Sequence, residues 1–139
     1  MSEKKDRYLF PAIFDFAADG ISVEFPDLPG CLTCGDTQEE AWRMAKEAMS
    51  LHIYGMEEDH LPIPDPSSVS NLKTERNQVI VLIEAFMPGF RREMEQQSVK
   101  KTLTIPKWLN KMAEDEKVNF SQILQDALKH RLGLNEHKH

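Results

Sequence analysis

The sequence predicts an α+β fold, in which a small antiparallel or mixed sheet with one packed helix precedes a dimerisation unit of one strand and two helices. Three observations support this prediction. Residues 8–25 alternate apolar and polar side chains, as two half-buried strands do. Residues 37–55 have the capping pattern and apolar spacing of an amphipathic helix. A last alternating run at 99–105 stands alone before two helical patterns.

The first two strands are expected to form a hairpin. Residues 8–16 place apolar or aromatic side chains at every second position, and residues 21–25 do the same. Asp19-Gly20 between them is a strong turn signal. Pro11 has no N–H to donate, so it predicts that the first strand lies at a sheet edge or contains a bulge.

The following stretch completes a small domain of order β-β-β-α-β. A third short strand is expected around 31–34, and Thr37 then caps a helix that should end near Gly55. Residues 57–77 are polar and rich in proline, which predicts an exposed loop. The continuous apolar run at 78–86 predicts a central strand buried on both faces.

The run from Val99 to Ile105 predicts a strand that needs a partner from a second chain. Its backbone N–H and C=O groups must be paired, yet no other strand follows it. The simplest partner is the same run of a second copy, paired antiparallel about a two-fold axis. Alternation places Val99, Lys101, Leu103 and Ile105 on one face and Lys100, Thr102 and Thr104 on the other.

Two helices should follow this strand. Pro106 begins the first, and Asn119 caps the second. Their apolar stripes should form the core of the dimer together with the inward face of the strand. The predicted dimer core consists of Leu103, Ile105, Trp108, Leu109, Ile123, Leu124 and Leu128.

Charge separates the chain into two parts. The whole chain carries −6, but residues 1–98 hold 9 Lys+Arg against 18 Asp+Glu, whereas residues 99–139 hold 8 against 5. An acidic part of −9 and a basic part of +3 suggest different partners. We expect domains at 1–88 and 99–139, joined by a connector at 89–98 that suits a short helix or a flexible linker equally well.

Composition also limits the compartment and the covalent chemistry. No apolar run approaches the roughly 20 residues of a membrane span, and the first residues lack a secretory apolar core. A cytoplasmic protein without membrane contact is therefore expected. Only two cysteines are present, so a disulfide framework is not expected.

The sequence resembles the HicB antitoxin family in four stretches, which are GISVEFPDLPGC at 20–31, GDTQEEA at 35–41, KTLTIPKWLN at 101–110 and NFSQIL at 119–124. Residues 99–133 also resemble a ribbon-helix-helix DNA-binding domain. The resemblance implies an antitoxin whose N-terminal domain, a partial RNase H fold, occludes a HicA-like, mRNA-cleaving toxin. It further implies that the C-terminal domain binds double-stranded operator DNA and represses its own operon. The expected assembly is a homodimer through 99–133, with a tetramer through the N-terminal domain left open.

Six residues are candidates for DNA binding. Lysine and threonine suit base edges in the major groove, although Lys100, Thr102 and Thr104 could also merely solvate an exposed strand. Asn119, Phe120 and Ser121 begin a helix whose free N–H groups could hold a DNA phosphate, although Asn119 could serve as a cap alone.

Acids and cysteines of the N-terminal part are the residue types that could support catalysis or bind a metal. Cys31 and Cys34 lack a second ligand pair and point to opposite faces of a strand, so they are interpreted as structural cysteines. The acids of the N-terminal part would suit a basic toxin better than a nuclease site, with Asp15, Glu24 and Asp27 as candidate toxin contacts. We expect no catalytic residue, metal or cofactor.

Two alternatives stay open at this point. The chain could be a stand-alone ribbon-helix-helix regulator whose N-terminal domain senses a small molecule or another protein. It could also be a metal-dependent nuclease that uses clustered carboxylates.

Overall fold

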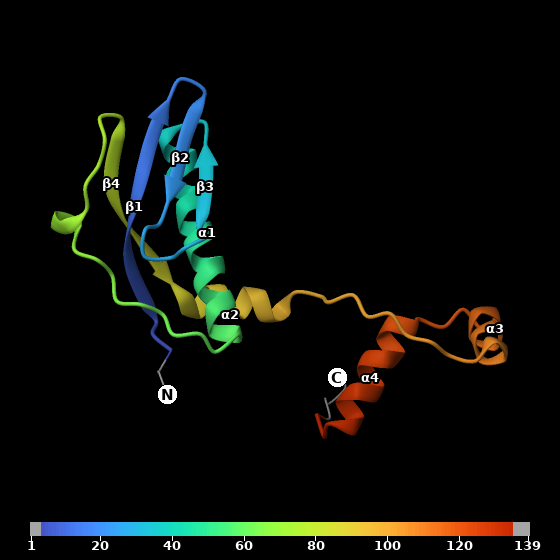
Figure 1. Ribbon diagram of the computed structural model, residues 1–139. Helices are drawn as coiled ribbons and strands as arrows, with labels where there is room; N and C mark the ends of the chain where they lie inside the picture. Colours follow the sequence, from blue (N-terminus) through green and yellow to red (C-terminus); the bar gives the residue numbers. More distant parts are fainter. Residues whose placement is uncertain (1–3, 135–139) are drawn as a thin grey trace. The chain divides into compact units, whose positions relative to one another are not determined.

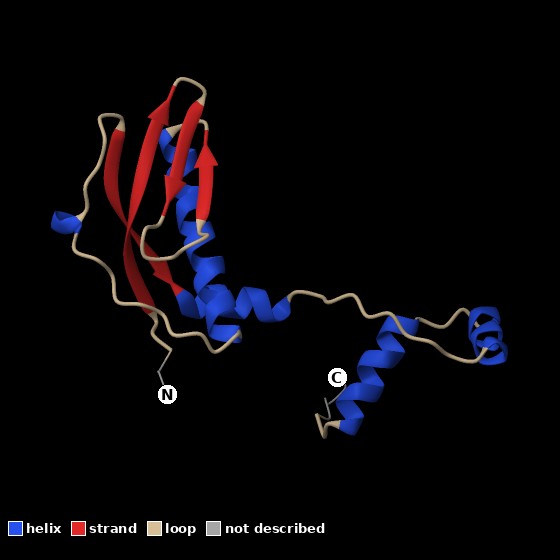
Figure 2. Cartoon of the chain, viewed as in Figure 1, coloured by secondary structure: helices blue, strands red, loops and turns tan. Residues whose placement is uncertain are grey.

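The computed structural model describes residues 4–134, and the chain divides into two compact units between Ser98 and Val99. Unit 1 contains β1 (Arg7–Ala17), β2 (Gly20–Glu24), β3 (Leu32–Gly35), α1 (Gln38–Glu58), the 3-10 turn η1 (Val69–Asn71), β4 (Gln78–Phe86) and α2 (Met87–Gln96). Unit 2 contains α3 (Lys107–Asp115) and α4 (Phe120–Arg131). Figures 1 and 2 show these elements.

Unit 1 is a four-stranded antiparallel sheet in the order β3-β2-β1-β4, with α1 behind it (Figure 1). The helix runs the length of the sheet, and residues 59–77 lead the chain back before β4 begins. This return explains why β4 lies antiparallel to β1 rather than parallel. The expected loop at 57–77 is confirmed from Asp59 onward, apart from the short turn η1.

The core lies between α1 and one face of the sheet. Small side chains on the helix let it approach the strands closely, and larger apolar side chains fill the space on either side. The helix contributes Ala41, Ala45, Met49 and Ile53, and the sheet contributes chiefly Phe10, Ala12, Phe14, Ile21, Val23, Ile83 and Ala85. Each large side chain buried here stabilises unit 1 by about 1.5–3 kcal/mol relative to an exposed one.

The predicted cap of α1 is confirmed. The Glu40 N–H donates to Oγ1 of Thr37 at 3.1 Å, and the Glu40 carboxylate in turn accepts from the backbone N–H of Asp36. The helix continues to Glu58, three residues beyond its predicted end at Gly55. Glycine lowers helix propensity but does not end a helix that is packed against a sheet, so Gly55 did not mark the end of α1.

Two predictions about strand position are wrong. β4 is an edge strand that pairs only with β1, and only its helix-facing side is buried. β1 is an interior strand, whereas Pro11 predicted that it lies at a sheet edge or contains a bulge. Proline is tolerated because β2 pairs with β1 only from Ile13 onward, so Pro11 lies beyond the end of that ladder.

The connector question is settled in favour of a helix over Met87–Gln96. Met87 is fully buried, and the Phe90 ring packs edge-on against Tyr54 at 6.1 Å between centroids. Arg91 donates to both carboxylate oxygens of Glu57, and this hydrogen-bonded ion pair raises the pKa of the guanidinium further. α2 is therefore fixed to α1 and belongs to unit 1.

Unit 2 confirms the two helices but not the strand. Residues 99–105 form no ladder in the described chain, because a single copy offers no neighbouring strand to pair with. α3 and α4 bury no residue. Among the described residues, no helix is both long and apolar enough to cross a membrane.

Candidate functional site

The first candidate surface is the extended segment 99–105 with the helices that follow it. Every residue from Val99 to Leu109 is exposed, so the predicted inward face and the predicted polar face are equally uncovered. Lys100, Thr102 and Thr104 are therefore accessible, but the structure does not test their role in DNA binding.

The predicted dimer core of unit 2 is solvent-exposed in the single chain. Exposed fractions range from 41% for Leu109 to 65% for Trp108, and Leu124 is half-buried. Leu103, Ile105, Ile123 and Leu128 lie within the same range. Large apolar side chains exposed to this extent are typical of surfaces that another protein covers, and the dimer core stays a prediction.

The start of α4 has the geometry of a capped helix. The Asn119 side chain accepts the Gln122 N–H at 3.0 Å, which confirms the predicted cap. Ser121 Oγ accepts from Gln125 at 3.4 Å, and Phe120 is exposed. The phosphate role of this turn stays a prediction.

The predicted toxin contacts lie in different environments. Asp15 and Glu24 share the face of the sheet opposite α1, where Asp15 also accepts from the Gln78 amide at 3.0 Å. Asp27 lies in the β2–β3 loop, and its carboxylate accepts both the N–H and the hydroxyl of Ser67. Asp27 thus holds the 59–77 loop in place, whatever else it contacts.

The cysteines are not paired with each other. Cys31 is buried, and burial raises the pKa of its thiol to about 11, whereas Cys34 is exposed. Across residues 4–134, no group of three or more His, Cys, Asp or Glu side chains is arranged to hold a metal ion.

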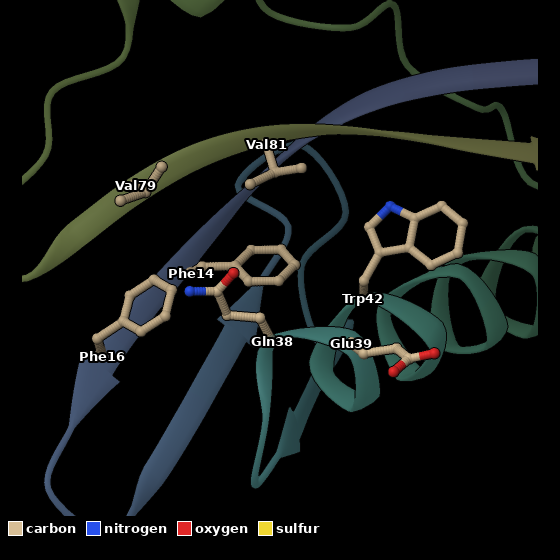
Figure 3. Close-up of a pocket in the computed structure, with 7 residues that line it drawn as sticks. All are labelled: Phe14, Phe16, Gln38, Glu39, Trp42, Val79 and Val81. Atoms are coloured by element: carbon tan, nitrogen blue, oxygen red, sulfur yellow. The ribbon is translucent and has the colours of Figure 1, made fainter.

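The second candidate surface is an apolar groove in unit 1, on the helix side of the sheet. The helix-facing side chains of β4 become progressively less covered toward its start, from fully buried Ile83 through half-buried Val81 to Val79, which is 51% exposed. α1 therefore diverges from β4 and leaves a hollow of about 670 Å³. Its lining, shown in Figure 3, consists of Phe14, Phe16, Gln38, Glu39, Trp42, Val79 and Val81.

Trp42 forms one wall of this groove. The residue is 44% exposed, and the ammonium of Lys46 lies over its ring, 4.7 Å from the ring centroid. Glu39 and Gln38 from the first turn of α1 lie at the rim in Figure 3. The sequence prediction missed this site. One signal in the sequence could have indicated it. Trp42 follows Ala41 and thus lies beside the buried stripe of α1, at a position where a solvated helix face normally carries a polar side chain.

Comparisons with known proteins show which family the chain resembles. Residues 10–128 match the family model described as "HicB_like antitoxin of bacterial toxin-antitoxin system". An uncharacterised 14.9 kDa protein of Haemophilus phage HP1 is 44% identical over 61 residues, which are 44% of this chain and 46% of that protein. Antitoxin HicB 2 of Photorhabdus laumondii is 42% identical over 59 residues, 42% of each chain. The matches thus span less than half the length of these relatives.

Solved structures extend the likeness along the chain. A chain of the "Toxin-Antitoxin complex from Streptococcus pneumoniae" aligns with a TM-score of 0.59 at 25% identity, covering 90% of this chain and 99% of that one. The antitoxin HicB of Burkholderia pseudomallei shares the fold, with a TM-score of 0.51 at 20% identity over 87% of this chain and 96% of that one. Since the family model spans most of the sequence, this protein belongs to the HicB-like antitoxin family.

Proposed function

We propose that this chain is the antitoxin of a type II toxin–antitoxin pair, in which unit 1 neutralises a HicA-like, mRNA-cleaving toxin and unit 2 represses the operon. The observation that carries the proposal is segment 99–105, which is extended and unpaired, and which precedes two helices without a buried residue. No catalytic role is proposed for the chain.

Unit 2 requires a second copy to become stable. A segment of about 40 residues rarely builds a sufficient core without oligomerisation. Antiparallel pairing of 99–105 about a two-fold axis would satisfy its backbone groups and bring the stripes of α3 and α4 together. The homodimer formed in this way is the ribbon-helix-helix unit of the proposal.

The outward face of the paired ribbon would read the operator. Two copies of Lys100, Thr102 and Thr104 would present donors and acceptors to the major groove. The starts of both α4 helices, at Asn119, would face DNA phosphates. The +3 charge of residues 99–139 favours DNA, whereas the rest of the chain is acidic.

Unit 1 would bind the toxin through charge and apolar contact. Enzymes that cleave RNA need positive surfaces, which the −9 charge of residues 1–98 complements. Among residues 4–98, Glu57 and Glu84 are the acids that form an ion pair, so exposed acids such as Glu24 are available to a basic partner. The toxin–antitoxin complex from Streptococcus pneumoniae supports this role. A partial RNase H fold and a tetramer through unit 1 remain predictions.

Truncation after Ser98 tests the two-unit proposal. The 1–98 fragment should lose operator binding and dimerisation through unit 2, while it still binds and inhibits the toxin encoded beside this gene. Operator binding retained by the fragment would contradict the proposal. A full chain that binds operator DNA but neither binds nor inhibits that toxin would favour the stand-alone regulator.

Thr102→Ala tests the reading face. Loss of a base contact should weaken operator binding by about 1–3 kcal/mol and leave binding to random DNA nearly unchanged. Thr74→Ala, at an exposed threonine of the 59–77 loop, is the control and should change neither. An equal loss on both DNAs would make the segment a phosphate contact, not a sequence reader. Electrophoretic mobility shift titrations at fixed salt measure both affinities.

A further inference from the structure

The groove between α1 and the start of β4 is an unfilled part of the unit 1 core. Phe14 at its floor is buried, whereas Val79 and Trp42 on its walls are about half exposed. Phe14 and Val79 belong to the face of the sheet that α1 covers elsewhere, where Ile83 and Ala85 are buried. The groove is therefore continuous with the core, and an apolar group placed in it would extend the same packing.

We propose that this groove receives a large apolar side chain of the toxin, and that Glu39 at its rim meets a lysine or arginine beside that side chain. This inference rests on the proposed antitoxin function and names the place where the partner is anchored. A few apolar anchors seated in pockets supply most of the affinity of protein interfaces. Acids such as Glu24, on the other face of the sheet, would then contribute mainly to attraction at a distance.

Charge selects the toxin over a second copy as the occupant. Residues 1–98 carry −9, so charge disfavours a second copy of unit 1 in this groove and favours a basic RNA-binding protein. Glu39 is exposed and forms no ion pair within residues 4–134. The ammonium of Lys46 already lies over the Trp42 ring. The rim acid is thus free for a cation from outside the chain.

The groove also has the size of an anchor site. Its volume of about 670 Å³ exceeds that of any single side chain, so it can hold an aromatic or long aliphatic group together with its neighbours. In Figure 3 the indole of Trp42 lies to one side of Phe14 and Val81, and Phe16 and Val79 lie to the other side. An aromatic side chain inserted here would contact rings on more than one side, which is favourable beyond area burial alone.

Affinity measurements on the full-length chain and the toxin encoded beside its gene test this inference. Trp42→Ala should weaken toxin binding at least about tenfold, because anchors in pockets dominate interfaces. Leu51→Ala is the matched control. Leu51 is a similarly exposed apolar residue of α1 that lies on the opposite side of the helix from Trp42, nine positions along the chain. Its truncation should change the affinity for toxin by less than about twofold. Circular dichroism establishes that each variant is folded.

A second pair of variants tests the rim charge. Glu39→Lys and Glu47→Lys change the net charge equally on the same helix, and both positions are exposed. Only the first should lower affinity markedly. Val79→Lys, which places a charge in the groove from the strand side at an exposed position, keeps the test valid if Trp42→Ala fails to fold.

Fluorine NMR reports on the site directly. With both tryptophans labelled by 5-fluorotryptophan, unlabelled toxin should shift the Trp42 resonance, while Trp108 in unit 2 serves as the internal reference. If the wild-type chain binds toxin while the Trp42 and Val79 variants bind equally well, the groove inference is overturned and the antitoxin function stands. If the wild-type chain does not bind toxin, the proposed function fails first. If Trp42→Ala lowers the subunit number in light scattering without toxin, the occupant is a second copy and the proposal is wrong.

Discussion

The ion pair between α1 and α2 gives the sharpest stability prediction. Arg91→Ala removes a guanidinium that donates to the Glu57 carboxylate at 2.6 and 3.0 Å. The Nη2 group of Arg91 that donates to Glu57 at 2.6 Å also donates to the backbone carbonyl of Lys5 at 2.7 Å. The variant therefore leaves one carboxylate without a cation and one backbone acceptor without its donor.

Burial decides the expected size of the effect. The side chain of Glu57 is 3% exposed and that of Arg91 is 16% exposed. An exposed ion pair contributes at most about 1 kcal/mol, but removal of one partner of a buried pair costs about 3–5 kcal/mol. We expect the larger loss, and a Tm of unit 1 lower by roughly 12 °C or more. Replacement of both residues by Met should recover most of the loss, because no charge is then buried alone.

Urea unfolding of the full chain measures this loss. Trp108→Phe in every variant leaves Trp42 as the single tryptophan, so its fluorescence reports on unit 1. Arg92→Ala is the control, since Arg92 is the exposed neighbour on α2 and its loss should change stability by less than about 0.5 kcal/mol. Equal losses for the two arginine variants would refute the reasoning, because the buried pair would then behave as a surface charge.

Three further predictions concern backbone and thiol positions. Gly35→Ala should destabilise unit 1 by about 1–3 kcal/mol, because the added Cβ would lie 2.5 Å from the Ala41 backbone nitrogen. Gly55→Ala adds a Cβ in open space and should stabilise α1 by about 0.5–1 kcal/mol. Equal changes in Tm for the two variants would contradict this reasoning. The free energy of unfolding should fall as pH rises from about 9 to about 11. In this range the raised pKa of Cys31 keeps its thiol neutral in the folded chain, while the thiol of the unfolded chain ionises. A Cys31→Ala chain should lack this loss in urea titrations. Lys117→Gly should stabilise unit 2 by about 0.5–1 kcal/mol and raise its Tm, because Lys117 has a φ of 55°, which glycine adopts without strain. An unchanged or lower Tm in calorimetry would argue against strain at this position.

Local signals predicted the starts of helices well. Thr37 and Asn119 cap their helices as expected, because a cap depends on residues within one turn. The strand assignments in unit 1 also follow from alternation of period two. Such patterns report what each segment can bury, and they require no knowledge of its neighbours.

Position within the sheet was not predictable in the same way. Residues 78–86 are apolar on both faces, which suits a central strand, but the chain offers a helix to cover only one of them. The groove is harder still, since it arises from the angle at which α1 crosses β4. That angle depends on packing between α1 and a strand far along the chain, with Ala45 and Met49 in the same core as Ile83, and no local pattern encodes it.

Segment 99–105 is a different kind of case. Its alternation is evident from the sequence, but its hydrogen-bond partners belong to another molecule in the proposed dimer. In a single chain its backbone groups therefore form no ladder within the described residues. This unpaired segment and the exposed stripes of α3 and α4 together favour the ribbon, because a plain linker would not need such stripes.

The end of unit 1 follows from how α2 is packed. α2 is fixed to α1 by Met87, Phe90 and Arg91, and it ends at Gln96. Only Gln97 and Ser98 then precede Val99, where unit 2 begins. The sequence of residues 89–98 suits a helix and a flexible linker equally, because the residue that fixes Arg91 is Glu57, which lies 34 positions earlier in the chain. The packing of α2 therefore depends on a contact that no pattern within residues 89–98 can reveal.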